Sequence, residues 1–258
     1  MKIKRIIISI CLALLLLFFN ACASGNENES NDKVEDQMKL SFSADWFIGK
    51  RVVVYGDSIT HGVGTSDKSK TYIDLLSKQI GFSYNNFAVS GSLLTYVNAM
   101  QDGRESGVEI ITEQKEYNQN ADYAIILYGA NDSTHRVFST TGYEASPNGL
   151  NEVSTFKQGI EYAVKTLRQH NKDIIIIFLT PILRTDNNGF SIETLNDYTQ
   201  LIMKLSSEYD YYYFDLYPLF TTENFSENSA YTSDGCHPND EGNRLIYQFL
   251  LDKELNGQ

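Results

Sequence analysis

Short apolar runs and helical apolar patterns alternate along most of the chain. Short runs of β-branched and aromatic side chains predict buried strands, whereas apolar residues at the spacing i, i+3, i+4 predict helices. The predicted strands are 52–55, 82–89, 124–128, 174–179 and 211–216, and the predicted helices are 72–80, 156–167, 195–205 and 241–253. Strands that alternate with helices favour a mostly parallel sheet between two helix layers. The sequence therefore predicts an α/β fold, a three-layer α/β/α sandwich around a mostly parallel five-stranded sheet.

Three segments follow neither pattern. Residues 24–45 contain Gly, Asn, Ser and Glu with few large apolar residues, which is typical of a flexible tether. Residues 93–120 mix polar and apolar positions, and we expect them to be partly helical. The segment 133–154 is longer than an ordinary connection between a strand and its helix. We expect it to be either a solvated loop or one wall of a ligand pocket.

The N-terminus has the form of an export signal. A basic start precedes an apolar segment at 6–19, which is short for a membrane span. Cys22 follows a small residue, and this arrangement resembles the lipobox at which bacterial lipoprotein precursors are cleaved and lipidated. The lipobox usually has leucine where this chain has Phe19, and an ordinary secretory signal cleaved near Ala23 is the alternative. The predicted parts are a lipoprotein signal peptide at 1–21, a flexible acidic tether at 22–45 and one catalytic domain at 46–258.

The charge balance argues against a nucleic-acid partner. The formal net charge is -12, and it becomes -15 without residues 1–21, which hold three basic and no acidic residues. Such a chain repels phosphates and anionic membrane surfaces. We therefore expect contact with a membrane only through a lipid on Cys22. This places the protein in the bacterial cell envelope, as a membrane-anchored lipoprotein that faces the outside or the periplasm, and the sequence gives no indication of its oligomeric state.

Cysteine and histidine usage argues against a disulfide and against a metal site. Once Cys11 has left with the signal peptide and Cys22 is acylated, Cys236 is the one cysteine left, so no intramolecular disulfide can form. The four histidines are dispersed and offer no set of metal ligands. The glycines at 56–64 do not have the spacing of a Walker or dinucleotide loop. We therefore expect no metal and no cofactor.

Polar turns that contain glycine follow three of the predicted strands. Ser58 follows the first strand, Gly91 the second and Asn131 the third, and a further polar turn with Asp234 and His237 precedes the last helix. Ligands of open α/β sheets bind at the carboxyl ends of the strands. Histidine is suited to take the proton of a serine hydroxyl, and a nearby carboxylate fixes its tautomer. The residues therefore favour Ser58 as nucleophile, His237 as base and Asp234 as the acid that orients it.

The four blocks together resemble the GDSL or SGNH hydrolase family, whose name lists Ser, Gly, Asn and His. They occur in the family's order over about residues 48–252, and the family's spacing of Asp, two residues and His is also present. Many members have threonine where this chain has Ala130. The resemblance implies a flavodoxin-like α/β/α fold and a serine esterase that works through an acyl-enzyme. It also implies an oxyanion hole formed by the backbone N–H groups of Ser58 and Gly91 and the side chain of Asn131.

The resemblance also indicates a class of substrate. For a surface-tethered member we expect a small-molecule or polysaccharide ester, with removal of O-acetyl groups from carbohydrate as the first choice. Tyr143, in the long segment 133–154, is then a candidate to stack on a sugar ring. One alternative is a lipase or lysophospholipase-type acylhydrolase of the same fold. The other is a ligand-binding lipoprotein that does no chemistry.

Each candidate residue also has a structural interpretation. Ser58 is compatible with a polar turn after a strand, Gly91 with a turn glycine, and Asn131 with a helix cap. Cys236 stands beside His237 and is an alternative nucleophile, although adjacent residues rarely point their side chains together. The sequence around Ser58 lacks the Gly-x-Ser-x-Gly elbow of α/β-hydrolases. This absence distinguishes the chain from the α/β-hydrolase fold.

Overall fold

The structure is a computed structural model, and it describes residues 41–96, 103–135, 147, 149–186, 192–252 and 255–256. The predicted signal peptide with Cys22, most of the predicted tether and Tyr143 lie outside these residues. Strand β1 (Ser41–Phe42) pairs antiparallel with β7 (Leu255–Asn256), and the 3-10 helix η1 (Ala44–Phe47) follows β1. Regular structure therefore begins before residue 46, within the last residues of the predicted tether.

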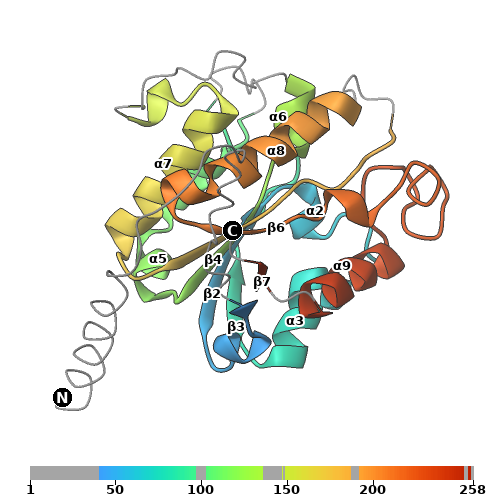
Figure 1. Ribbon diagram of the computed structural model, residues 1–258, viewed down its shortest axis with the longest axis horizontal. Helices are drawn as coiled ribbons and strands as arrows, with labels where there is room; N and C mark the ends of the chain where they lie inside the picture. The colour runs from blue at the N-terminus through green and yellow to red at the C-terminus, as the bar shows by residue number, and fades with distance from the viewer. Residues whose placement is uncertain are drawn as a thin grey trace, which may run out of the picture. The chain divides into compact units, whose positions relative to one another are not determined.

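A five-stranded parallel sheet forms the centre of the domain (Figure 1). Its strands are β2 (Arg51–Gly56), β3 (Ser83–Asn86), β4 (Tyr123–Leu127), β5 (Ile175–Leu179) and β6 (Tyr212–Phe214). Their order is β3-β2-β4-β5-β6, with every neighbouring pair parallel. After β2 the chain adds β3 at one edge of the sheet, and then adds β4, β5 and β6 in turn on the other side of β2. The order thus reverses next to β2, which is where ligands bind in sheets of this kind.

Helices cover both faces of the sheet (Figure 1). The α-helices are α2 (Ser58–His61), α3 (Tyr72–Ile80), α4 (Gly107–Glu113), α5 (Lys115–Asn120), α6 (Ala130–His135), α7 (Phe156–His170), α8 (Ile192–Tyr209) and α9 (Asp240–Asp252). The 3-10 helices after η1 are η2 (Lys68–Lys70), η3 (Leu150–Glu152) and η4 (Tyr217–Leu219). Val52 and Val54 pack in one core with α3 and α9, whereas Val53 and Tyr55 pack in a second core with α4, α7 and α8. This alternation confirms the predicted three-layer α/β/α sandwich.

The predicted strands at the two edges are longer than the observed ones. β3 ends at Asn86 and not at residue 89, yet the N–H groups of Phe87 and Val89 still donate to carbonyls of β2. The predicted helix 72–80 matches α3, and 241–253 lies one residue beyond α9, whereas α7 extends past residue 167 and α8 extends beyond 195–205 at both ends. Helix ends carry exposed polar residues, which the apolar pattern does not report. The mixed region before residue 120 holds α4 and α5, and the capping box of Ser106 and Glu109 begins α4.

One buried carboxylate joins the turns that follow β3 and β4. Asp132, in the first turn of α6, accepts hydrogen bonds from the N–H groups of Leu94 and Thr95 and from the Thr95 hydroxyl, at 3.1 to 3.2 Å. Burial raises the pKa of Asp132 to about 6, although these hydrogen bonds act in the opposite direction. The segment after Gly91 is therefore attached to the helix that carries Asn131.

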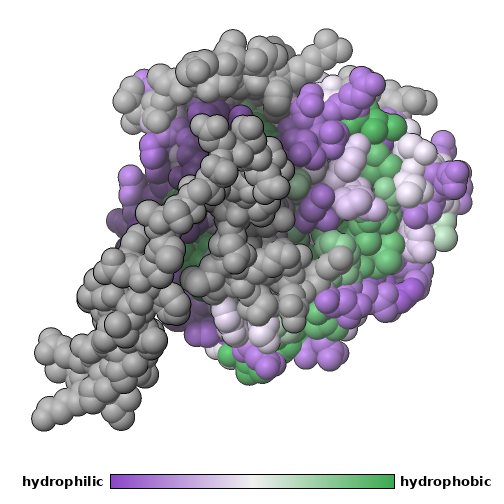
Figure 2. Space-filling view, viewed as in Figure 1, coloured by the Kyte–Doolittle hydropathy of each residue, from purple (hydrophilic) through white to green (hydrophobic). Residues whose placement is uncertain are grey.

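The surface mixes polar and apolar residues. Figure 2 shows hydrophilic and hydrophobic residues interspersed on the coloured part of one face. Among the described residues, the exposed large hydrophobic side chains are Trp46, Ile48, Tyr117 and Ile192. In that same part of the chain, no helix has both the length and the hydropathy that crossing a bilayer requires.

Replacing Asp132 by alanine is expected to lower the free energy of unfolding by roughly 3 kcal/mol, because buried donors would lose a charged acceptor. Urea denaturation followed by circular dichroism measures this change. Asp173 is exposed, and its replacement by alanine is the control, with an expected change within about 0.5 kcal/mol. Equal changes in the two variants would contradict the role of Asp132 in attaching the segment after Gly91 to α6.

Candidate active site

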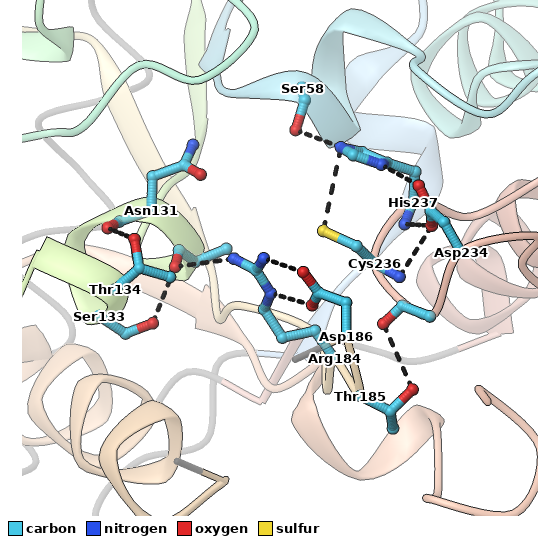
Figure 3. A network of polar contacts seen from close by, with 12 residues as sticks. Ser58, Asn131, Ser133, Thr134, Arg184, Thr185, Asp186, Asp234, Cys236 and His237 are labelled. Atoms are coloured by element: carbon cyan, nitrogen blue, oxygen red, sulfur yellow. Dashed lines mark hydrogen bonds and ion pairs between the residues drawn. The ribbon is translucent and has the colours of Figure 1, made fainter. Parts of the chain in front are cut away.

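A hydrogen-bonded chain of three side chains lies at the carboxyl edge of the sheet (Figure 3). His237 Nε2 is 2.9 Å from Ser58 Oγ, and His237 Nδ1 is 2.7 Å from Asp234 Oδ2. The structure thus brings together the three residues that the sequence nominates as nucleophile, base and orienting acid. With the Nδ1 proton directed at the carboxylate, Nε2 is the nitrogen that can accept a proton from the hydroxyl.

The Asp234 carboxylate organises the turn that carries the histidine. Its Oδ1 accepts the N–H groups of Cys236 at 2.9 Å and His237 at 2.8 Å, and also the Thr232 hydroxyl at 3.1 Å. Burial acts to raise the pKa of Asp234, but the hydrogen bonds from His237 and Cys236 outweigh it and hold the pKa at about 2. The carboxylate is therefore ionised at neutral pH, with Oδ1 bound to the turn and Oδ2 bound to the imidazole.

Ser58 is the first residue of α2, directly after β2. Asp57 caps this short helix by accepting the Ile59 N–H at 3.0 Å, and Gly62 ends it in the left-handed conformation. Burial raises the pKa of Asp57 to about 6, against the effect of the Ile59 hydrogen bond. Ser58 itself is only 7% exposed. The Ser58 hydroxyl is therefore held at the start of a short capped helix. It is largely buried and lines the cavity described below.

Gly91 and Asn131 line the same cavity as Ser58. Gly91 has a φ of +78°, and a Cβ at this position would lie 1.6 Å from the nearest guanidinium nitrogen of Arg104. The left-handed backbone conformation favours glycine here, whereas the end of the Arg104 side chain could move away from a Cβ. Asn131 Nδ2 donates to the Ser92 carbonyl at 3.0 Å, which fixes the direction of the amide next to Gly91. The two residues that the resemblance nominates as oxyanion donors are thus on the wall that Ser58 faces.

The cavity has a volume of about 300 Å³, and most of the residues that line it have polar side chains. Its lining residues are Ser58, Ser90, Gly91, Asn131, Arg184, Asp186, Asp234, Cys236 and His237. Three of these side chains are charged at neutral pH, one is an amide and two are hydroxyls. The wall is therefore suited to a small polar group.

Arg184 and Asp186 are cavity residues that the sequence analysis did not single out. They follow β5, so a fourth strand delivers side chains to the same edge. Their ion pair joins Arg184 Nε to Asp186 Oδ1 at 2.7 Å and Arg184 Nη2 to Oδ2 at 2.6 Å. Burial acts to lower the pKa of Arg184, but the hydrogen bonds with Asp186 raise it above its ordinary value. The sequence does contain an indication of this ion pair, because two opposite charges stand two residues apart after a predicted strand.

The expectation that Cys236 and His237 point apart is wrong. Cys236 Sγ lies 3.9 Å from His237 Nε2, because both backbone N–H groups bind the same oxygen of Asp234 and the turn curls around it. Burial raises the pKa of the Cys236 thiol to about 12, so the group is protonated at neutral pH and is a poor nucleophile. The described residues also contain no group of three or more His, Cys, Asp or Glu side chains placed to hold a metal ion.

Solved structures with the same fold include several hydrolases. A "possible lipase" from Chitinophaga pinensis DSM 2588 is 21% identical, with a TM-score of 0.61 over 79% of this chain and 96% of that one. Est24, a carbohydrate acetylesterase from Sinorhizobium meliloti, is 16% identical, with a TM-score of 0.58 over 79% and 97%. A lipase/acylhydrolase from Enterococcus faecalis is 17% identical, with a TM-score of 0.55 over 78% and 93%. At these identities the likeness establishes the α/β/α fold.

Comparison of the sequence with protein families extends this result. The GDSL-like lipase/acylhydrolase family model matches residues 54–245, a range that contains Ser58, Asp234, His237 and the whole cavity wall. No curated protein sequence matches the chain. The family match covers most of the described domain, in agreement with the resemblance carried by the sequence blocks. The chain therefore belongs to the GDSL-like lipase/acylhydrolase family.

Proposed function

We propose that the protein is a serine esterase in which Ser58 is the nucleophile, His237 the general base and Asp234 the carboxylate that orients the base. The observation that carries this proposal is the hydrogen-bonded chain from Asp234 Oδ2 through the imidazole to Ser58 Oγ. A serine hydroxyl is unreactive until a base removes its proton, and this geometry provides the base. A protein that only binds a ligand does not need an imidazole held between a carboxylate and a serine hydroxyl.

The reaction follows from these contacts. Ser58 Oγ attacks the carbonyl carbon of the ester as its proton passes to His237 Nε2, and Asp234 stabilises the imidazolium. The carbonyl oxygen becomes an oxyanion, which the N–H groups of Ser58 and Gly91 and the amide of Asn131 stabilise. When the tetrahedral intermediate collapses, the alcohol leaves with the proton from Nε2 and the acyl group stays on Oγ. Water activated by the same nitrogen then releases the acid and restores the hydroxyl.

The cavity wall supports a short acyl group attached to a polar alcohol. A longer acyl chain gains roughly 0.8 kcal/mol per CH₂ only where it leaves water for apolar surroundings. Here the chain would meet Arg184, Asp186 and Asn131. We therefore propose removal of acetyl groups from carbohydrate as the activity, and the acetylesterase fold relative is consistent with it. A lipase or lysophospholipase activity is the alternative, and it would require an apolar wall.

We further propose that the enzyme is exported and held at the cell envelope by a lipid on Cys22. The basic start, the apolar segment at 6–19 and the small residue before Cys22 support this proposal. Cells grown with an alkyne-labelled fatty acid should incorporate the label into the wild-type protein and not into a Cys22→Ser variant. Equal labelling of the two proteins would contradict the anchor.

Replacing Ser58 by alanine is expected to reduce hydrolysis of p-nitrophenyl acetate by at least roughly 1,000-fold, because the nucleophile is lost. Purified protein comprising residues 23–258 is the material for this assay. Ser207, which is exposed on α8, is the matched control, and its replacement by alanine should leave the rate unchanged. Equal rates for the wild type and the Ser58→Ala variant would overturn the enzyme assignment and favour the binding protein.

The polar wall leads to a prediction about acyl-chain length. The kcat/KM for p-nitrophenyl acetate should exceed that for the octanoate by at least roughly 10-fold, since the longer chain would meet the charged and amide side chains of the described wall. Acetylated sugars such as glucose pentaacetate should release acetate, which an enzyme-coupled acetate assay detects. Preference for octanoate or for a lysophospholipid would instead support the lipase alternative.

A further inference from the structure

The residues that follow β5 lie between the two sides of the candidate site. Arg184 and Asp186 belong to the cavity wall, and Thr185 stands between them in the sequence. Figure 3 shows this tripeptide with Asn131 on one side and with Cys236 and His237 on the other. Its hydrogen bonds reach both sides.

The Arg184 guanidinium is held in one orientation inside the protein. Arg184 is only 5% exposed, and its Nε and Nη2 donate side by side to the two carboxylate oxygens of Asp186. Such a two-pronged pair sets the plane of the guanidinium as well as its position. The other terminal nitrogen, Nη1, donates to the Ala130 carbonyl oxygen at 3.3 Å.

The Ala130 carbonyl belongs to the peptide bond that joins Ala130 to Asn131. A hydrogen bond to this oxygen therefore restrains the backbone of Asn131. The Ser133 hydroxyl donates to the same oxygen at 2.8 Å, and the Asn131 side chain donates to the Ser92 carbonyl at 3.0 Å. Asn131 is thus restrained through its backbone by Arg184 and through its amide by Ser92.

Thr185 connects the same segment to the turn that carries the histidine. Its N–H donates to the Gly235 carbonyl at 2.7 Å, and its hydroxyl donates to the Phe225 carbonyl at 2.7 Å. The two segments lie so close that a Cβ on Gly235 would be 2.5 Å from Thr185 Oγ1 and 3.2 Å from the backbone nitrogen of Asp186. Gly235 lies between Asp234 and His237 in the sequence, so the segment after β5 also restrains the position of the base.

A buried ion pair is a costly way to fill a cavity wall, because both charges lose their hydration. Apolar side chains would fill the same volume without that cost, but they could not donate to the Ala130 carbonyl. We propose that Arg184, held by Asp186, is a positioning residue that sets Asn131 for stabilisation of the oxyanion. This inference rests on the proposed role of Asn131 as an oxyanion donor.

The first test replaces Arg184 by lysine, which keeps the charge but cannot bind Asp186 with two parallel donors and reach Ala130 as well. A small displacement of Asn131 weakens an interaction made in the transition state. The kcat for p-nitrophenyl acetate should therefore fall by roughly 10- to 100-fold, while KM changes little. Titration of Ser58 with a fluorophosphonate counts the folded sites, so that unfolded protein does not enter kcat.

The second test asks whether Arg184 acts through Asn131. Asn131→Ala alone should lower kcat by roughly 100- to 1,000-fold. In that background, adding Arg184→Lys should cause almost no further loss, because the group that it positions is already absent. An equal loss in both backgrounds would overturn the inference and leave the esterase assignment intact. A near-normal kcat for Asn131→Ala alone would overturn the oxyanion role, and the inference with it.

Arg168 provides a matched control for a purely structural role. Its guanidinium also donates to backbone carbonyls, those of Tyr209 and Asp210, and it also pairs with a carboxylate, that of Asp210. Arg168→Lys should leave kcat unchanged, since these contacts do not reach the cavity. If Arg184→Lys does not fold, Asp186→Asn takes its place in the same cycle, because it loosens the guanidinium without removing it. A loss of kcat in Asp186→Asn that persists undiminished in the Asn131→Ala background would again overturn the inference.

Discussion

The parallel direction of the five strands is the constraint on which the site depends. Because all of them run the same way, the chain leaves every strand at the same edge of the sheet. β2 leads to Ser58, β4 to Asn131 and β5 to Arg184, and the reversal of strand order next to β2 leaves a crevice between them. Short buried strands are therefore sufficient to bring groups from distant parts of the sequence into one cavity of about 300 Å³.

Buried charges shape the turns at this edge. Asp57 caps the helix that begins with Ser58, and Asp132 binds the loop after Gly91 to the helix of Asn131. Burial raises the pKa of both carboxyls to about 6, because the ionised form loses water that the backbone N–H groups replace only in part. These two carboxylates fix the positions of the turns, although burying their charge costs free energy. Such a cost is expected where a site needs donors and acceptors in fixed positions.

Much of the fold and part of the site were predictable because they depend on local pattern. Buried strands are short apolar runs, Ser58, Gly91 and Asn131 stand in recognisable blocks after strands, and Asp234 and His237 stand in a block before the last helix. Arg184 and Asp186 stand in no such block, and the burial of Arg184 and its contact with Ala130 arise only when β5 lies beside β4. The approach of Cys236 to the imidazole was not predictable either, since it follows from two N–H groups that share one carboxylate oxygen. A contact between distant segments therefore accounts for Arg184, and the geometry of one local turn accounts for Cys236.

The placement of Asp234 and His237 on one turn reduces the number of distances that the tertiary structure must maintain. The carboxylate binds both the imidazole and the backbone of the same short segment, so acid and base move together as a unit. Among these three side chains, the rest of the protein has to preserve a single separation, that between Nε2 and Ser58 Oγ. In the proposed mechanism, a shift of this turn would interrupt proton transfer from the serine without disturbing the pairing of acid and base. Mutations elsewhere in the domain that change this separation would then slow the proposed reaction.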